Sequence, residues 1–304
     1  MVSIIIPYFE RPVKLRRALD AIKEQSYKAV EVIVVDDGSK EPIDDTLLKQ
    51  VEYIKCKDNK GPGAARNVGL KKATGEYIVF LDSDDYWAPL FLEKIVDALK
   101  MNQQAIMAYT QGYLLDADGI ITKDSSKKLV KPNNILPSVL QYRRPWFTSA
   151  CVWRTSKIKR LKWLETRAWE DYAFDVNAAI ICNIVICVDE FLIYYDISGE
   201  DKLSDQSAYQ ASIEKNKSII HIAKCINQSN FFRDHLIKRL ITKLLISNLI
   251  ALLSNDIEIR ELYLNSVAMI RKYRGFWISE LVLFSTNIKP KFGLFLLRKL
   301  RRTI

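Results

Sequence analysis

The stretch Tyr77-Ile78-Val79-Phe80-Leu81, followed by Asp82-Ser83-Asp84-Asp85, joins a short apolar run directly to three carboxylates. A continuous apolar run of this length is typical of a strand in a parallel sheet that helices cover on both faces. Carboxylates massed at a strand end are costly, because like charges raise one another's pKa unless a cation holds them. Such oxygen ligands suit Mg²⁺ or Mn²⁺ shared with a substrate phosphate. An acidic turn or helix cap is the alternative interpretation.

Outward from this stretch, short apolar runs alternate with helical patterns. We expect strands at 2–6, 30–35, 52–55 and 77–81, and helices at 13–25 and 64–73. This alternation predicts an α/β fold with a Rossmann-like, doubly wound, mostly parallel sheet, which binds ligands beyond the carboxyl ends of its strands. Asp36-Asp37 and Pro7-Tyr8-Phe9 also follow expected strands, so three turns are expected to converge on one crevice.

A glycine-rich turn, Lys60-Gly61-Pro62-Gly63, precedes the second expected helix. It matches neither the dinucleotide-binding pattern nor the P-loop pattern. One interpretation is a flexible connection; the other is that Arg66, one helical turn further on, reaches the diphosphate of a nucleotide near the helix N-terminus.

Composition indicates a globular protein with a basic C-terminal third. The chain has 304 residues, of which 49% are hydrophobic, and a net charge of +10. Residues 1–200 hold 28 Lys and Arg against 28 Asp and Glu, whereas residues 201–304 hold 18 against 8. The excess therefore predicts an anionic partner surface for the last third. Five cysteines without metal-ligand spacing and only two histidines argue against most zinc sites and favour a reducing cytoplasm.

Five segments, in order along the chain, resemble the motifs of family 2 inverting glycosyltransferases with the glycosyltransferase-A fold. They are Val2-Ser3-Ile4-Ile5-Ile6-Pro7-Tyr8-Phe9, Val34-Val35-Asp36-Asp37-Gly38-Ser39, Gly63-Ala64-Ala65-Arg66-Asn67-Val68-Gly69, Phe80-Leu81-Asp82-Ser83-Asp84-Asp85 and Trp169-Glu170-Asp171-Tyr172. The resemblance covers roughly residues 1–200 and extends to bacterial enzymes that assemble O-antigen and other surface polysaccharides.

The resemblance implies a nucleotide-sugar site in the first half of the chain. Pro7 and Phe9 would line the base pocket, and Asp37 would accept the base N3–H, a contact that usually goes with uracil. The other implied roles are ribose contact for Asp82, metal ligation for Asp84 and support of that site for Asp85. A metal together with Arg66 would stabilise the charge that develops on the departing diphosphate. Glu10 stands where Asn is common and places an extra negative charge near this pocket.

The resemblance makes Asp171 the catalytic base that takes the proton of the acceptor hydroxyl, with possible support from Glu170. A single base is sufficient for an inverting transfer. Asp171 is also a good cap for an expected helix at 172–180, and both roles can hold together. Trp146 is a candidate wall of the acceptor site, although an indole at such a position is more often part of the core.

The chain departs from the family pattern at Tyr194-Tyr195-Asp196-Ile197, where the family often has a further metal-ligating His. Its absence predicts a weak Mn²⁺ or Mg²⁺ site that depends on bound substrate.

We expect a catalytic domain at 1–205, with a nucleotide-sugar half at about 1–100 and an acceptor half at about 101–205, and a helical region at 206–304. The basic segment 286–304 interleaves Lys and Arg with Leu and Phe. It is typical either of a helix on an anionic membrane or of a solvated tail whose leucines pack on the protein.

The sequence thus predicts a metal-dependent inverting hexosyltransferase that uses a nucleotide sugar, most simply a UDP-sugar. By the resemblance, its acceptor is a lipid-linked bacterial glycan, and the enzyme lies peripherally at the cytoplasmic face of the inner membrane. The alternatives are a sugar-1-phosphate nucleotidyltransferase, although its N-terminal glycine-rich loop is absent, and a basic nucleic-acid-binding protein, although no reading motif is visible. No nucleic-acid partner is expected.

Overall fold

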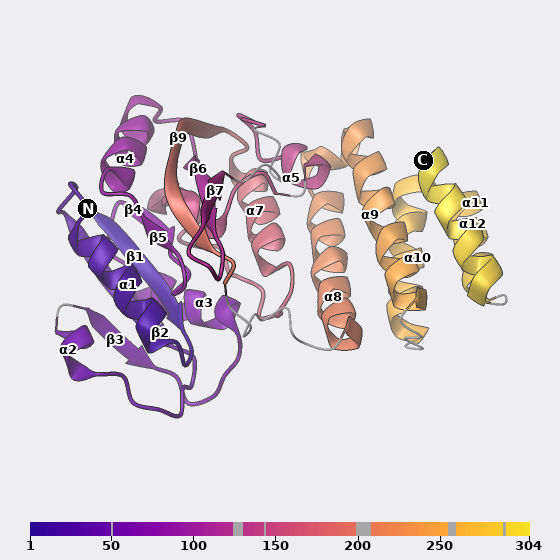
Figure 1. Ribbon diagram of the computed structural model, residues 1–304. Helices are drawn as coiled ribbons and strands as arrows, with labels where there is room; N and C mark the ends of the chain where they lie inside the picture. Colours follow the sequence, from indigo (N-terminus) through magenta and orange to yellow (C-terminus); the bar gives the residue numbers. More distant parts are fainter. Residues whose placement is uncertain (50, 124–129, 143, 199–207, 255–259, 288–289) are drawn as a thin grey trace. The chain divides into compact units, whose positions relative to one another are not determined.

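A computed structural model describes residues 1–49, 51–123, 130–142, 144–198, 208–254, 260–287 and 290–304 (Figure 1). The chain forms two compact units. The first comprises Met1–Glu165 with Ile181–Glu200, and the second comprises Thr166–Ile180 with Asp201–Ile304. In this division the segment that holds Asp171 is grouped with the C-terminal helices, for example through the contact of Asn177 with His221. The expected catalytic domain at 1–205 remains a prediction.

The first unit is built on a nine-stranded sheet of order β3-β2-β1-β4-β8-β6-β9-β5, with β7 paired to β6. Six strands run in one direction, since β3, β2, β1 and β4 pair in parallel, and β6 and β9 follow the same direction beyond the antiparallel β8. The expected mostly parallel sheet is therefore confirmed. The strands are β1 (Val2–Tyr8), β2 (Val30–Asp36), β3 (Glu52–Lys55), β4 (Tyr77–Phe80), β5 (Tyr86–Trp87), β6 (Met107–Leu115), β7 (Ile121–Lys123), β8 (Cys151–Arg154) and β9 (Val185–Asp196).

Helices cover both faces of this sheet, as the buried β1 requires. Ile4 and Ile6 point into the cluster formed with α1 and α4, whereas Ile5 points to the opposite face and meets α3. A Cβ at Gly69 of α3 would lie 2.4 Å from an Ile5 methyl carbon, so this glycine lets helix and strand approach closely. The helices of this unit are α1 (Pro12–Lys23), α2 (Asp45–Leu48), α3 (Pro62–Lys72), α4 (Phe91–Met101), α5 (Ser138–Gln141) and α6 (Thr155–Ile158).

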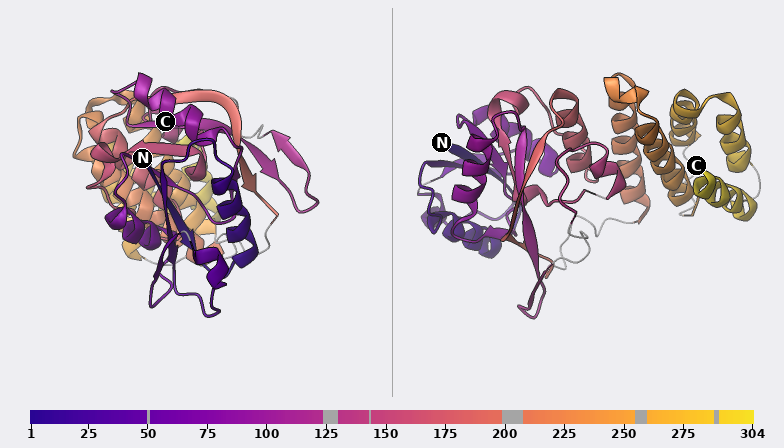
Figure 2. Two further views of the ribbon diagram at one scale, coloured as in Figure 1. Left: turned by 90° about the vertical axis from the view of Figure 1, so that its left-hand side faces the viewer. Right: turned by 90° about the horizontal axis from the view of Figure 1, so that it is seen from above.

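Strands β6 and β7 form a hairpin whose turn includes Gly119 at φ +75°. Figure 2 shows the hairpin extending from the first unit. Glycine tolerates a positive φ better than any other residue, so Gly119 suits this turn.

The second unit is helical, as expected. Its helices are α7 (Glu170–Ile181), α8 (Ala208–Asn227), α9 (His235–Ser254), α10 (Arg260–Arg274), α11 (Phe276–Asn287) and α12 (Pro290–Thr303). Consecutive helices from α8 to α12 pack on one another, and α12 also packs on α9. Fully buried aliphatic residues of α8 and α9, such as Ile222 and Leu245, form its core. Within the described residues, no helix combines the length and apolarity needed to cross a membrane.

Candidate functional site

The carboxyl ends of β1, β2 and β4 bring three polar turns to one edge of the sheet. Tyr8 pairs with Asp36 in register, the backbone N–H of Asp37 donates to the Tyr8 carbonyl, and the N–H of Leu81 donates to the Ile5 carbonyl. Because these strands are parallel, the turns that follow them start side by side. The three turns therefore start together at this edge, where the sequence predicts a crevice.

Asp37 fastens the glycine-rich turn to this edge. Its two carboxylate oxygens accept the backbone N–H groups of Lys60 at 3.0 Å and Gly61 at 2.7 Å. Gly61 has φ +94° and precedes α3, which begins with Pro62. Phe9 is 38% exposed at the end of β1, whereas Pro7 is buried within that strand. The Asp37 N–H donates to the carbonyl of Tyr8, so Asp37 lies next to the end of β1 that carries Phe9. An exposed ring can stack on a base, whereas Asp37 is 5% exposed and both of its carboxylate oxygens already accept backbone N–H groups.

Arg66 lies buried at the start of α3. Its guanidinium donates to Asp82 at 2.6 Å and stacks over the Trp163 ring at 4.4 Å. The Asp82 side chain is 28% exposed and that of Arg66 only 4%. The residues predicted to contact the ribose and the diphosphate are therefore neighbours, and the stack on Trp163 fixes the orientation of the guanidinium.

The carboxylate of Asp84 forms an ion pair with Arg11 at 2.7 Å. The guanidinium of Arg17 donates to the backbone carbonyl of Asp84 at 2.5 Å and pairs with Asp196. Removal from water, and then the negative charge of Asp82, raise the pKa of Asp84, while Arg11 opposes the rise. A positive charge beside Asp84, as Arg11 already supplies, favours the ionised carboxylate and lowers its pKa.

Asp85 points inward and is fully buried. One oxygen accepts the Ser149 hydroxyl at 2.6 Å and the other accepts the backbone N–H of Asp196 at 3.2 Å. Ser149 in turn accepts the N–H of Asp82 at 3.0 Å. Burial first, then the charges of Asp84 and Asp82, raise the pKa of Asp85 well above its usual range. Asp85 therefore holds the acidic turn against β9 and the segment before β8.

This donor set fits a hard divalent cation. Asp82 and Asp84 present partly exposed oxygens on one turn, and carboxylate oxygens are the ligands that Mg²⁺ and Mn²⁺ prefer. In the described part of the chain, no cluster of three or more His, Cys, Asp or Glu suits a metal. Asp196 lies in the segment where the family often has a metal-ligating His. Its carboxylate contacts Lys14, Arg17 and Ser198. Phosphate oxygens and water would have to complete the coordination.

Two of the predicted site residues, Glu10 and Trp146, have structural contacts. Glu10 adopts φ +50°, and its carboxylate accepts the backbone N–H of Lys40 at 3.2 Å, so it ties the first turn to the loop after β2. Trp146 is 1% exposed and packs on Tyr109 with ring centroids 4.9 Å apart. Trp146 is therefore a core residue, and its buried indole cannot stack on a sugar.

In the second unit, α7 begins at Glu170, so Asp171 lies in the first helical turn and does not precede the helix. Its carboxylate accepts the N–H of Tyr172 at 2.8 Å. Trp169 has φ +64°, stacks on the Tyr172 ring at 4.1 Å and lies under the Lys215 ammonium at 4.4 Å. A bulky residue in this left-handed region is strained and is found mostly at functional sites.

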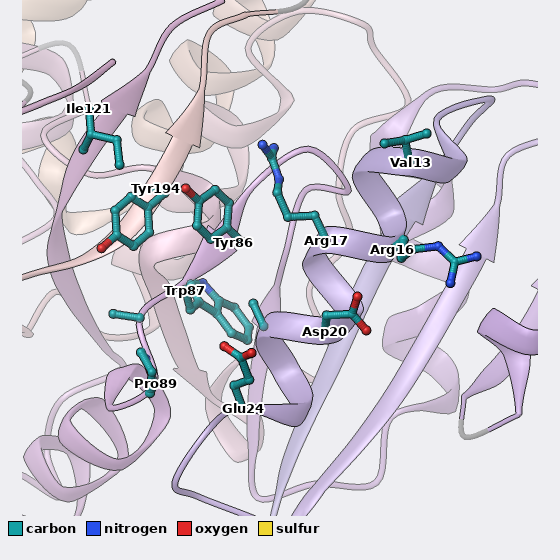
Figure 3. Close-up of a pocket in the computed structure, with 12 residues that line it drawn as sticks. Val13, Arg16, Arg17, Asp20, Glu24, Tyr86, Trp87, Pro89, Ile121 and Tyr194 are labelled. Atoms are coloured by element: carbon teal, nitrogen blue, oxygen red, sulfur yellow. The ribbon is translucent and has the colours of Figure 1, made fainter. Parts of the chain in front are cut away.

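A separate open groove of about 590 Å³ lies between α1, β5 and β9. Figure 3 shows Asp20 and Glu24 on one side of it, and the stacked rings of Tyr86 and Tyr194 on the other. Arg17 lines the groove and also contacts the Asp84 turn. None of the residues predicted for the nucleotide sugar lines this groove.

Four residues that contact the acidic turn or one another were not predicted from the sequence: Arg11, Arg17, Ser149 and Asp196. Arg11 lies in the turn after β1, and Arg17 lies on α1. Basic residues are common in a helix-forming segment, so nothing in the local sequence indicates a role at the site. Asp196 lies in the segment where the family often has a metal-ligating His, and nothing in its local sequence indicates an ionic role. Each contacts an acidic residue far away in the sequence, so only the fold reveals it.

Comparison with known proteins places this geometry in a family. The family model described as glycosyl transferase family 2 matches residues 3–114. An uncharacterized glycosyltransferase of Haemophilus influenzae is 34% identical over 241 residues, which cover 77% of this chain and 84% of the relative. Another from Nostoc is 27% identical over 243 residues, with 72% and 74% covered.

The fold is shared with solved structures of S. aureus TarS. TarS 1–349 in complex with UDP superposes with a TM-score of 0.74 at 18% identity, covering 100% of this chain and 92% of that one. Its complex with UDP-GlcNAc gives a TM-score of 0.71 at 19% identity, with 99% and 92% covered. The match to the family and the extent of the Haemophilus relative show that this chain belongs to glycosyl transferase family 2.

Proposed function

We propose that this glycosyltransferase transfers a hexose from a UDP-sugar, with inversion and with help from Mn²⁺ or Mg²⁺, to a hydroxyl of a lipid-linked bacterial glycan. The observation that carries the proposal is the meeting of Asp37, Asp82 and Asp84 at one sheet edge, beside Phe9 and Arg66. Family membership sets aside the nucleotidyltransferase and the nucleic-acid-binding protein as primary functions. The UDP and UDP-GlcNAc complexes of TarS, which shares the fold, support uridine as the base.

The chemistry follows from where charge develops. Departure of a nucleoside diphosphate increases negative charge on its phosphate oxygens, and preorganised cations stabilise that charge best. Arg66 is held in place by Asp82 and Trp163, so it is oriented before substrate arrives. A divalent cation bound at Asp84 would neutralise the diphosphate further.

A single carboxylate is sufficient for the other half of the reaction. Asp171 would accept the proton from the acceptor hydroxyl as its oxygen attacks the anomeric carbon from the face opposite the diphosphate. The bond from this carbon to the diphosphate oxygen breaks as the new bond forms, so the configuration inverts without a covalent intermediate.

The donor site can be tested without knowledge of the acceptor. We expect UDP with Mn²⁺ to raise the melting temperature of the protein by a few degrees, since a ligand at one hundred times its Kd stabilises by about 2.7 kcal/mol. GDP, CDP and dTDP should give smaller shifts, and Asp84→Asn should remove the dependence on Mn²⁺.

Differential scanning fluorimetry provides the measurement, with Asp97→Asn as the control because Asp97 pairs with Lys100 on the exposed side of α4. Equal shifts with all four nucleotides would contradict the uridine assignment, and no shift with any of them would contradict the donor site itself.

We also propose that the basic tail contacts an anionic membrane surface. Leu297 and Ile304 of the tail are buried within the helical unit, whereas Arg298, Lys299, Arg301 and Arg302 are exposed. Residues 288–289 of the predicted tail lie outside the described residues. Leu297 therefore packs on the protein, whereas Phe295 of the same helix is 58% exposed. The exposed cations and the 82% exposed Trp277 support contact with an anionic surface.

We expect the protein to co-sediment with vesicles that contain phosphatidylglycerol, and much less with neutral vesicles or at high salt. Each cation near an anionic membrane contributes about 1 kcal/mol, so Arg298→Gln with Arg302→Gln should weaken partitioning by about thirtyfold. Lys94→Gln with Lys100→Gln, on the exposed side of α4, is the matched control. Equal binding to neutral vesicles would refute the electrostatic attachment.

A further inference from the structure

In the acidic turn, residues 82–85, a cationic side chain already pairs with the partly exposed carboxylate of Asp84. Arg11 Nη1 lies 2.7 Å from Asp84 Oδ2, and the two side chains are 26% and 24% exposed. This oxygen belongs to the residue that is the candidate metal ligand. A guanidinium and a divalent cation at the same carboxylate would repel each other strongly at such short range.

The position of Arg11 is fixed by the start of α1. Arg11 occupies the N-cap position of α1, directly before Pro12 at the first helical position. Lys14 and Arg17 follow at steps of three on the same helix, and both pair with Asp196. Residues three apart share a helix face, so α1 presents a cationic face to the acidic turn and the end of β9.

The three cations differ in what they hold. Arg17 donates to the backbone carbonyl of Asp84, and Lys14 and Arg17 pair with Asp196. Arg11 contacts the Asp84 carboxylate itself. A metal that binds this carboxylate therefore has to displace or share the contact of Arg11, while the Arg17 contact can persist.

We infer that Arg11 is the resident counter-ion of Asp84 and competes with the divalent cation for it, which couples cation binding to nucleotide binding. The inference rests on the proposed function for the nucleotide half alone. A bound diphosphate would supply anionic oxygens both to complete the cation's coordination and to receive the Arg11 guanidinium. Without the nucleotide, Arg11 would keep the free protein's affinity for the cation low.

The test measures Mn²⁺ binding to the full chain without nucleotide, by electron paramagnetic resonance of the unbound ion. Arg11→Gln should bind Mn²⁺ on the order of tenfold more tightly than the unaltered protein, as expected for loss of a half-buried ion pair. Arg11→Lys, which keeps the charge, should retain the weak affinity. Arg16→Gln is the control, because Arg16 is on the same helix but pairs with Asp44, with both side chains about half exposed.

Saturating UDP should reduce the difference between Arg11→Gln and the unaltered protein to less than about threefold, because the diphosphate then relieves the competition. Adding Asp84→Asn to Arg11→Gln should abolish the gain in Mn²⁺ affinity. Unchanged or weaker Mn²⁺ binding by a folded Arg11→Gln protein, verified by its melting temperature, would overturn the inference. Failure of UDP to bind any variant would overturn the proposed function instead, and the Mn²⁺ comparison without nucleotide would still decide the role of Arg11.

Discussion

Asp171→Asn is expected to lower the turnover number for sugar transfer by about 100- to 10,000-fold, the range for loss of a general base. Asparagine has the same shape and still offers an oxygen to the Tyr172 N–H, so the start of α7 should be preserved. It cannot accept the proton of the acceptor hydroxyl. The measurement is UDP release that depends on acceptor, with UDP binding in Mn²⁺ followed in parallel and expected to stay within about twofold.

Glu170→Gln is the matched control, because Glu170 also lies in the first turn of α7. Its loss should cost far less if it only supports the neighbouring base. A larger loss with Glu170→Gln than with Asp171→Asn would transfer the role of base to Glu170. Equal and small losses with both variants would contradict a carboxylate base in this segment.

The start of α7 could not be predicted from the sequence. Asp is frequent directly before helices, so the sequence predicts Asp171 as the cap of a helix at 172–180. The helix begins at Glu170 instead, so Asp171 lies inside it. Trp169, directly before Glu170, has a left-handed backbone, and its ring packs on Tyr172. Propensity gives no reason to expect a tryptophan at positive φ, since the conformation is held by its surroundings.

The sheet, by contrast, was largely predictable. Strand β3 was expected at its observed bounds, and β2 and β4 within one residue of theirs. These strands are apolar on both faces because helices cover both, and that pattern is local in the sequence. Their order and direction also explain why Asp37 and Asp82 meet, since parallel strands bring their carboxyl ends to one edge.

The ionic network was not predictable from local pattern. Arg17 and Asp196 are 179 positions apart, and Arg11 and Asp84 are 73 apart, so no spacing rule connects them. Trp146 shows the opposite difficulty, since nothing in its neighbourhood distinguishes a sugar platform from a core ring. Burial decides such cases, and burial is a property of the whole fold.

Arg66→Met should separate the stabilising role of this side chain from its proposed role in catalysis. Arg66 is 4% exposed at its side chain, and its removal leaves Asp82 without the guanidinium that now neutralises it. We expect the free energy of unfolding to fall by about 1–3 kcal/mol, the cost of an unpaired polar partner in a mostly buried setting. Turnover should fall by about 100- to 1,000-fold, because the departing diphosphate loses a preorganised donor.

The second variant, Arg66→Met with Asp82→Asn, removes the unpaired charge and should regain most of the lost stability, as measured by urea denaturation. Transfer should stay low, because a neutral pair cannot stabilise the charge that grows on the diphosphate. Arg66→Lys should also transfer slowly, since an ammonium reproduces neither the forked hydrogen bonds nor the stack on Trp163. Recovery of transfer together with stability in the double variant would mean that Arg66 acts only by holding α3 and the Asp82 turn together.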